Sequence, residues 1–263
     1  MPELPDVERF RRFFRANAAG RTVGALRADP TILRNCTPRT LSAALRGRRF
    51  DEPARHGKWL IAWTDGPALL MHFGMTGYLL WADDEGSTRT EPHRHDRLVI
   101  RFDEGGELRY RNMRKLGGLW LAHDPDEVSG LLGTLGPDAL SVGRAEFLRL
   151  LARRRGGLKA ALMDQTLLAG VGNLMADEIL WQARLHPTHP VESLTAEERL
   201  QLHSALRRIL RQAVATEDYA ENRPGWLLHV RGRPGASCPR CRGPLSRMVA
   251  AGRTTYFCQR CQP

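Results

Sequence analysis

Four cysteines near the C-terminus place the strongest constraint on how this 263-residue chain can fold. They form two Cys-x2-Cys pairs, Cys238 with Cys241 and Cys258 with Cys261, and 16 residues separate the pairs. Two such pairs supply four thiolates, which is the closed tetrahedral ligand set of a structural zinc site. Disulfides are the alternative, but the chain opens without a secretory signal and a cytosolic location disfavours them. We therefore expect one structural Zn²⁺.

The residues between the two cysteine pairs are typical of a short β-hairpin. Residues 247–249 and 254–257 read as strands, and residues 250–253 read as the turn that joins them. The sequence thus predicts a zinc-ribbon finger over residues 226–263. The fifth cysteine, Cys36, is far from these pairs and is expected to be an isolated thiol.

The first half of the chain shows a strand pattern. Val7, Phe10 and Phe14 share one face of a leading helix, and short apolar runs broken by Gly, Pro and Asp follow it. These runs predict an N-terminal β-sandwich domain over residues 1–134. The predicted strands are 59–63, 68–73, 78–81, 98–102, 108–110 and 119–121.

Helical periodicity dominates after residue 135, in runs at 145–151, 159–165, 174–182 and 196–214. The sequence predicts a helical domain over residues 135–225, so that the whole chain is of the α+β, multidomain class. Residues 168–173 join two of these helices and contain two glycines. Either this is ordinary helix-hairpin packing, or free N–H groups at the start of the second helix bind a phosphate, with Asn173 as cap or direct contact.

The charge balance favours a polyanionic partner. The chain has 40 Lys and Arg against 29 Asp and Glu, a formal charge of +11. No apolar run reaches the roughly 20 residues of a membrane span, so nucleic acid is expected rather than a membrane. Lysine is rare among the cations, at Lys58, Lys115 and Lys159. An arginine-rich genome would explain the bias, or each lysine marks a place where a compact, titratable ammonium is required.

The N-terminus offers a possible nucleophile. Removal of Met1 would leave Pro2 with a free secondary amine, which titrates near pH 8, and Glu3 would lie beside it as acid or base. Attack on a carbonyl-like carbon would give a cationic iminium suited to elimination. The alternative is that Pro2 only begins the segment leading into the first helix.

Five motifs in order along the chain resemble the bacterial formamidopyrimidine-DNA glycosylase and endonuclease VIII family. They are Pro2-Glu3-Leu4-Pro5, His56-Gly57-Lys58, His72-Phe73-Gly74-Met75-Thr76-Gly77, Ala169-Gly170-Val171-Gly172-Asn173 and the terminal cysteine ribbon. The resemblance implies a β-sandwich, a helix-two-turn-helix domain and a zinc finger. It also implies excision of oxidised or ring-opened bases from a flipped nucleotide, followed by cleavage of the abasic site by β,δ-elimination.

The resemblance also assigns roles to particular residues. Pro2 attacks the anomeric carbon, Glu3 assists ring opening and proton transfer, and Lys58 assists elimination. Glu178 would tune the protonation of the N-terminal amine, with Asp6 as a further supporting carboxylate in a position where Glu is usual. The other residues assigned to catalysis or DNA contact are His72, Met75, Arg114, Lys115, Leu116 and Lys159, together with Asn173 and Arg253 as the phosphate clamp.

Two departures bear on the lesion that is excised. Leu116 replaces an aromatic wedge and Lys115 an Arg, and residues 215–225 are shorter than the loop that covers flipped 8-oxoguanine in guanine-directed relatives. Ring-opened purines, oxidised pyrimidines as in endonuclease VIII, or an unusual adduct are therefore alternatives to 8-oxoguanine.

Two other classes of protein compete with the enzyme. One is a non-catalytic zinc protein that binds damaged DNA; the other is a zinc-ribbon transcription or RNA-processing factor, which leaves the first 130 residues unexplained. The expected partner is double-stranded DNA with damaged bases or abasic sites, bound by a monomer in the bacterial cytoplasm at the nucleoid.

Overall fold

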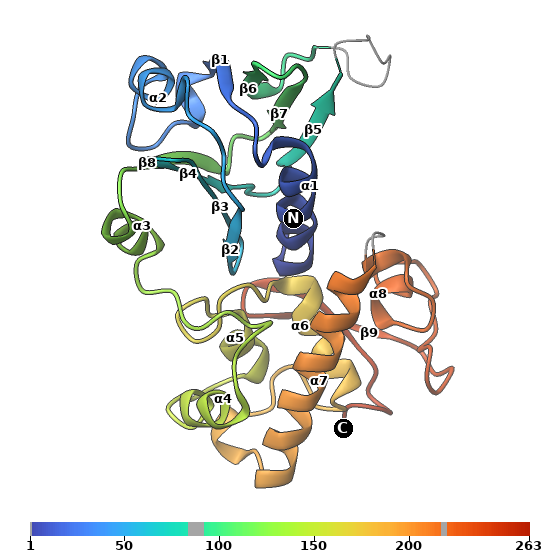
Figure 1. The fold of residues 1–263 in the computed structure, drawn as a ribbon. Helices are drawn as coiled ribbons and strands as arrows, with labels where there is room; N and C mark the ends of the chain where they lie inside the picture. The colour runs from blue at the N-terminus through green and yellow to red at the C-terminus, as the bar shows by residue number, and fades with distance from the viewer. Residues whose placement is uncertain (1, 84–91, 217–219) are drawn as a thin grey trace. The chain divides into compact units, whose positions relative to one another are not determined.

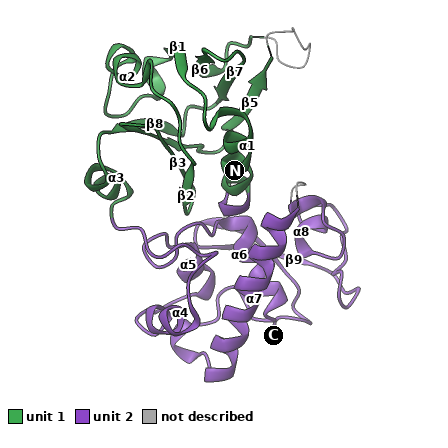
Figure 2. Cartoon of the chain, viewed as in Figure 1, with its two compact units in different colours: residues 1–2, 6–133 green, residues 3–5, 134–263 purple. Residues whose placement is uncertain are grey.

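The computed structural model describes residues 2–83, 92–216 and 220–263 (Figure 1). Its internal contacts divide the chain into two compact units, residues 1–2 with 6–133 and residues 3–5 with 134–263 (Figure 2). The predicted α+β class is confirmed. The predicted three-domain division stays a prediction, because the helical and zinc-finger parts belong to one unit. Within the described ranges, no helix has both the length and the apolar character that crossing a membrane requires.

Unit 1 is built on two four-stranded antiparallel sheets. The first has the order β1 (Val23–Ala28), β6 (Asp96–Phe102), β7 (Glu107–Arg111) and β5 (Tyr78–Ala82). The second has the order β2 (Ala54–His56), β3 (Trp59–Trp63), β4 (Ala68–His72) and β8 (Gly118–Ala122). Alternate side chains of both sheets enter one buried core, which is the arrangement of the predicted sandwich.

Helices cover this sandwich. Helix α1 (Leu4–Ala18) inserts Phe14 into the core between the sheets, and α2 (Pro38–Leu45) inserts Leu41, both fully buried. On the opposite face of the second sheet, α3 (Pro125–Leu132) packs Val128 into a smaller cluster rich in tryptophan. A 3-10 turn, η1 (Pro30–Ile32), follows β1.

Unit 2 surrounds a second core with helices. Its elements are α4 (Arg144–Leu151), α5 (Leu158–Met163), α6 (Asn173–Gln182), η3 (Val191–Ser193), α7 (Ala196–Ala215), η4 (Ala220–Asn222) and α8 (Leu227–Val230). Helix α6 lies at the centre, and seven consecutive residues from Met175 to Trp181 are buried. Because α6 is central, its side chains contact residues of several surrounding elements of unit 2.

The C-terminal hairpin pairs β9 (Ser246–Ala250) with β10 (Arg253–Phe257). Ala251 and Gly252 form its two-residue turn with φ values of 52° and 65°, as a type I′ turn requires. The turn is shorter than the sequence predicts, and Arg253 is therefore the first residue of a strand, paired with Ala250.

Candidate functional site

Glu3 is bound at the N-terminus of α6. Its side chain is buried, and its carboxylate accepts three backbone hydrogen bonds. Oε2 accepts from the N–H groups of Gly172 and Met175, each at 3.0 Å, and Oε1 accepts from Leu174 at 2.8 Å. A carboxylate is favoured here because the first N–H groups of a helix carry its positive partial charge. The residue that follows Pro2 in the chain is thus fixed by backbone groups.

The two glycines before α6 make room for this arrangement. A Cβ on Gly172 would overlap the Glu3 carboxylate, and a Cβ on Gly170, where φ is +114°, would overlap the Leu4 side chain. The Leu4 N–H donates to the Gly170 carbonyl at 3.1 Å. Of the two alternatives for this segment, that of N–H groups free for a phosphate does not hold for Gly172, Leu174 and Met175, because Glu3 occupies them. Asn173 is also not the cap, which is Gly172.

Lys159 lies at the centre of a buried polar cluster. Its Nζ donates to Asn173 Oδ1 and to Thr255 Oγ1, both at 2.6 Å, and forms an ion pair with Asp177 Oδ1 at 2.6 Å. The Lys159 side chain has no exposed surface. Burial lowers the pKa of Lys159, although the neighbouring Asp177 carboxylate acts in the opposite direction. The Lys159 ammonium has protein partners only, and its predicted role in DNA binding stays a prediction.

The same cluster ties α6 to the hairpin. Asn173 Nδ2 donates to the Thr254 carbonyl at 3.2 Å, and Arg231 Nη2 donates to the same oxygen at 2.7 Å. Arg231 Nε also pairs with Asp177 Oδ2 at 2.8 Å. Arg253, with an exposed side chain, precedes Thr254 in β10. One set of contacts therefore joins Asn173 to the strand that carries Arg253, the other predicted phosphate-clamp residue.

Glu178 is fully buried on α6. Its Oε1 accepts from Gln182 Nε2 at 2.9 Å, and its Oε2 accepts from the Leu228 N–H at the start of α8 at 3.1 Å. Burial raises the pKa of Glu178 to about 7, against the lowering effect of these two hydrogen bonds. Glu178 therefore titrates near neutral pH, and its predicted influence on the N-terminal amine stays a prediction.

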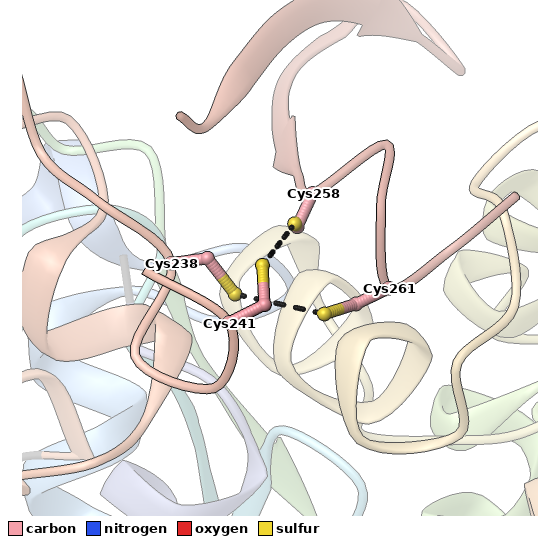
Figure 3. A group of neighbouring side chains, drawn as sticks. All are labelled: Cys238, Cys241, Cys258 and Cys261. Atoms are coloured by element: carbon pink, nitrogen blue, oxygen red, sulfur yellow. Dashed lines mark hydrogen bonds between the residues drawn. The ribbon is translucent and has the colours of Figure 1, made fainter. Parts of the chain in front are cut away.

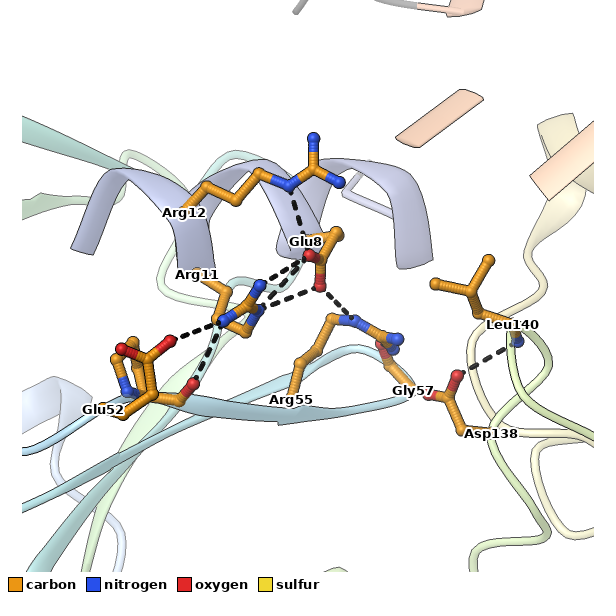
Figure 4. A network of polar contacts seen from close by, with 9 residues as sticks. Glu8, Arg11, Arg12, Glu52, Arg55, Gly57, Asp138 and Leu140 are labelled. Atoms are coloured by element: carbon orange, nitrogen blue, oxygen red, sulfur yellow. Dashed lines mark hydrogen bonds and ion pairs between the residues drawn. The ribbon is translucent and has the colours of Figure 1, made fainter. Parts of the chain in front are cut away.

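Lys58 lies in the two-residue turn between β2 and β3, and an ion network holds this turn (Figure 4). Arg55 Nη1 donates to the Gly57 carbonyl at 2.9 Å, and Arg55 Nε lies 3.1 Å from Glu8 Oε2. Arg11 also pairs with Glu8, at 2.9 Å. Burial raises the pKa of Glu8, but the hydrogen bonds and charges of Arg11 and Arg55 outweigh it and lower that pKa overall. Glu8 and Arg55, which the sequence analysis missed, thus fix the backbone that carries Lys58.

Asp6 lies in the first turn of α1 and pairs with Arg9 one turn further on. An acidic residue in the first turn also complements the helix dipole. The structure gives Asp6 this local partner, and its supporting role in the chemistry stays a prediction.

His72 ends β4 and is half-buried. Burial lowers the pKa of His72 to about 4, and the positive charge of Lys58 acts in the same direction. Its Nδ1 accepts from the Gly74 N–H at 3.3 Å. His72 is therefore neutral at physiological pH, where it can offer DNA a hydrogen bond but no charge.

Two neighbouring loops of unit 1 present the predicted void-filling residues. Arg114 Nη1 lies 3.4 Å from Met75 Sδ, and a Cβ on Gly74 would overlap the backbone between Leu116 and Gly117. The side chains of Met75 and Leu116 are 41% and 54% exposed. The predicted wedge residues therefore come together on the surface, although the sequence separates them by about 40 residues.

Asn112 joins these loops and was not predicted. It is fully buried, and its Oδ1 accepts from Thr76 Oγ1 at 3.2 Å and from the Lys115 N–H at 2.9 Å. Its Nδ2 donates to the Phe73 carbonyl at 3.2 Å and to Tyr110 Oη at 2.8 Å. Lys115 has a φ of 54° and pairs through Nζ with Asp29 at 3.2 Å. The predicted phosphate contact by Lys115 competes with that ion pair.

The four cysteines of the C-terminal ribbon converge (Figure 3). Their sulfur atoms all lie within 4.8 Å of one another, with Cys241 and Cys258 at 3.4 Å and Cys238 and Cys261 at 3.9 Å. Zinc–sulfur bonds of about 2.3 Å in a tetrahedron place sulfur atoms about 3.8 Å apart, so this set fits one structural Zn²⁺. Trp181 Nε1 donates to Cys238 Sγ at 3.4 Å and connects the ribbon to α6.

Comparison with protein families matches three parts of the chain. Residues 1–119 match the formamidopyrimidine-DNA glycosylase N-terminal domain, residues 135–222 match the H2TH domain of the same enzyme, and residues 237–263 match the zinc finger found in FPG and IleRS. Formamidopyrimidine-DNA glycosylase of Thermus thermophilus is 40% identical, and the alignment covers all of this chain and 98% of the relative. The enzyme of Chloroflexus aurantiacus is 35% identical with the same coverage.

Solved structures give the same result. The Fpg protein of Lactococcus lactis in complex with DNA containing an abasic site is 29% identical to this chain, with a TM-score of 0.88 and 99% coverage of both chains. A complex of that protein with DNA containing N7-benzyl-Fapy-dG is 28% identical, with the same TM-score and coverage. The similarity thus extends over the whole chain, in sequence and in fold.

Proposed function

This chain belongs to the formamidopyrimidine-DNA glycosylase family, and from that premise we propose that it is a bifunctional DNA glycosylase and abasic-site lyase. The observation that carries the catalytic assignment is the Glu3 carboxylate fixed by three N–H groups at the start of α6. A peptide bond links Glu3 to Pro2, so the anchored carboxylate also restricts the candidate nucleophile. A restricted nucleophile reacts more readily, because it loses less conformational freedom when it attacks the substrate.

The proposed chemistry begins when the Pro2 nitrogen, freed by removal of Met1, attacks C1′ of the damaged nucleotide. The N–C1′ bond forms as the glycosidic bond breaks, and the base leaves with the proton that the proline nitrogen loses. O4′ then takes a proton delivered through Glu3, the C1′–O4′ bond breaks, and the electron pair of the proline nitrogen forms the C=N⁺ bond of the opened sugar. The resulting iminium withdraws electrons, so that a C2′ proton is lost and the bond to the 3′-phosphate breaks. A second elimination releases the 5′-phosphate. In the proposed mechanism, Glu3 exchanges protons with the sugar, and the Lys58 ammonium binds the phosphate that leaves.

The proposed substrate is duplex DNA with an oxidised or ring-opened base. Positive charge, the exposed Met75 and Leu116, and the Asn173 and Arg253 pair support it. The L. lactis protein has been solved with a Fapy-dG lesion, which favours ring-opened purines, with oxidised pyrimidines as the alternative. The short segment 215–225 bears on this choice, but residues 217–219 of it lie outside the described residues. We further propose that a monomer acts on nucleoid DNA in the bacterial cytoplasm.

Borohydride trapping tests the proposal. An abasic-site duplex should give a covalent adduct that mass spectrometry maps to the Pro2 nitrogen, and Pro2→Gly should abolish or greatly reduce trapping. Glu3→Gln should bind the duplex normally and stop base release. Failure of the correctly processed protein to give an adduct would instead support a damage-binding protein without catalysis.

A further inference from the structure

A chain of buried contacts leads from α6 to the backbone of Arg253. Asp177 Oδ1 lies 2.6 Å from Lys159 Nζ, and Lys159 Nζ donates to Thr255 Oγ1 at 2.6 Å. The same Thr255 hydroxyl then donates to the Arg253 carbonyl at 3.1 Å. Asp177, Lys159 and Thr255 are all at most 1% exposed, so water does not compete for these contacts.

The donor and acceptor groups fix the direction of each hydrogen bond in this series of contacts. An ammonium group can only donate hydrogen bonds. Lys159 donates to Asn173 and to Thr255, and it forms an ion pair with Asp177. The Thr255 oxygen must therefore accept from Lys159, which leaves its proton for the Arg253 carbonyl. A hydroxyl that accepts from a cation is a stronger donor, so each bond strengthens the next.

The contact orients the beginning of β10. Arg253 directly follows the turn residues Ala251 and Gly252, both with positive φ. Arg253 and Thr255, two residues apart in β10, share one face of the strand. Thr255 is buried on that face, whereas Arg253, at the end of the strand next to the turn, is exposed. A fixed carbonyl at Arg253 therefore limits the directions that its guanidinium can take.

We propose that Thr255 is a positioning residue that, with the buried Lys159, directs the Arg253 guanidinium toward a DNA phosphate. This inference rests on the proposed function, since it needs Arg253 to contact DNA. Because Lys159 also binds Asn173, a single ammonium sets the separation between the two phosphate contacts.

A matched pair of substitutions tests the hydroxyl. Thr255→Val keeps the shape and the strand preference but removes the donor, whereas Thr255→Ser keeps the donor. Thr166→Val is the control, because that exposed hydroxyl also lies between a cation, Arg154 at 2.8 Å, and an acceptor, Asp164 at 2.7 Å. Affinity for an abasic-site duplex is measured over a range of salt concentrations.

Thr255→Val should weaken binding about fivefold to tenfold and reduce the salt slope by about one, the effect of one lost phosphate contact. Thr255→Ser and Thr166→Val should stay within about twofold of wild type. Adding Thr255→Val to Arg253→Ala should cause no further loss, since both changes remove the same contact. Zinc content is measured in parallel, and Thr255→Ala replaces Thr255→Val if the latter loses zinc.

The outcomes distinguish the positioning role of Thr255 from the phosphate clamp of Asn173 and Arg253. If Arg253→Ala weakens binding but removal of the Thr255 hydroxyl does not, or if the two losses add, the positioning role is wrong and the phosphate clamp stands. If Arg253→Ala leaves binding and salt slope unchanged, the clamp itself is wrong and the positioning role falls with it. Borohydride trapping at Pro2 reports on the catalytic proposal independently of either result.

Discussion

The Glu3 carboxylate and Gly172 occupy adjoining space so closely that a single methyl group on Gly172 would overlap the carboxylate. Gly172→Ala should therefore displace Glu3 from the start of α6. Misplacement of a catalytic group by about 1 Å can cost on the order of 100-fold in rate, and we expect a loss of that size in base release. Single-turnover cleavage of a lesion-containing duplex measures it.

Gly143→Ala is the matched control, because a Cβ at Gly143 meets no atom within 4 Å. Its φ of −74° is also ordinary for alanine. This control should retain the wild-type rate, with a loss of stability of at most about 1 kcal/mol, because Gly143 is the N-cap of α4 and alanine is a poorer N-cap than glycine. A Gly172→Ala protein that is folded and fully active would contradict the role of the Glu3 anchor.

The raised pKa of Glu178 predicts how the stability of the fold depends on pH. The carboxyl ionises near 4.5 when exposed in the unfolded chain, but burial raises its pKa to about 7 in the folded protein. The folded state thus binds more protons between these values, and the contribution of Glu178 to stability falls as pH rises from about 4.5 to 7, by about 1.4 kcal/mol per unit of pKa difference when complete. Glu178→Gln should flatten this part of the profile.

Urea unfolding at pH 5 and pH 8 measures that effect. Glu146→Gln on α4 is the control, because Glu146 is exposed and its pairing with Arg149 is long, at 3.9 Å. The control should follow the wild-type profile. An unchanged pH profile in Glu178→Gln would show that Glu178 does not titrate with a raised pKa.

Much of the fold follows from local sequence. Residues 59–63 form β3 as predicted, and the runs at 174–182 and 196–214 lie within α6 and α7, because periodicity and burial coincide there. Helices α2 and α3 were missed because both fall within residues 1–134, where the strand pattern dominates the sequence. Their beginnings were nevertheless visible, since Thr37 and Asp124 each precede a proline and cap the helix.

Some parts of the candidate site can be predicted from the sequence and others cannot. The cysteine ligands are predictable because each pair is local, and one tetrahedral ion brings the pairs together. The Glu3 anchor is not predictable, since nothing near Glu3 in sequence indicates which helix it reaches. Lys159 and Asp177 would be assigned to the surface by residue type, whereas each is buried because the other neutralises it.

Asn112→Ala should disturb both loops that carry the predicted wedge residues. The substitution leaves the Lys115 N–H without its Asn112 acceptor and removes one of the two donors to the Phe73 carbonyl, which also accepts from the Gly77 N–H. A lost hydrogen bond of this kind costs about 1–3 kcal/mol of stability where the group is buried. Loop displacement should also reduce cleavage of a lesion in duplex DNA more than trapping on a single-stranded abasic site, since only the duplex has a void to fill. Equal losses on both substrates would contradict the wedge assignment.

Cys258→Ser should release the zinc ion and weaken binding to damaged and undamaged duplexes alike. Without the metal the hairpin is no longer held in place, and the contacts of β10 with α6 and Lys159 are lost. Arg253 then no longer has a fixed position. Cys36→Ser is the control, because Cys36 lies outside the cluster of four sulfurs, and it should keep both zinc and affinity. Zinc content and duplex affinity are measured on the same samples. Retention of normal affinity after zinc is lost would show that the ribbon does not support the phosphate contact.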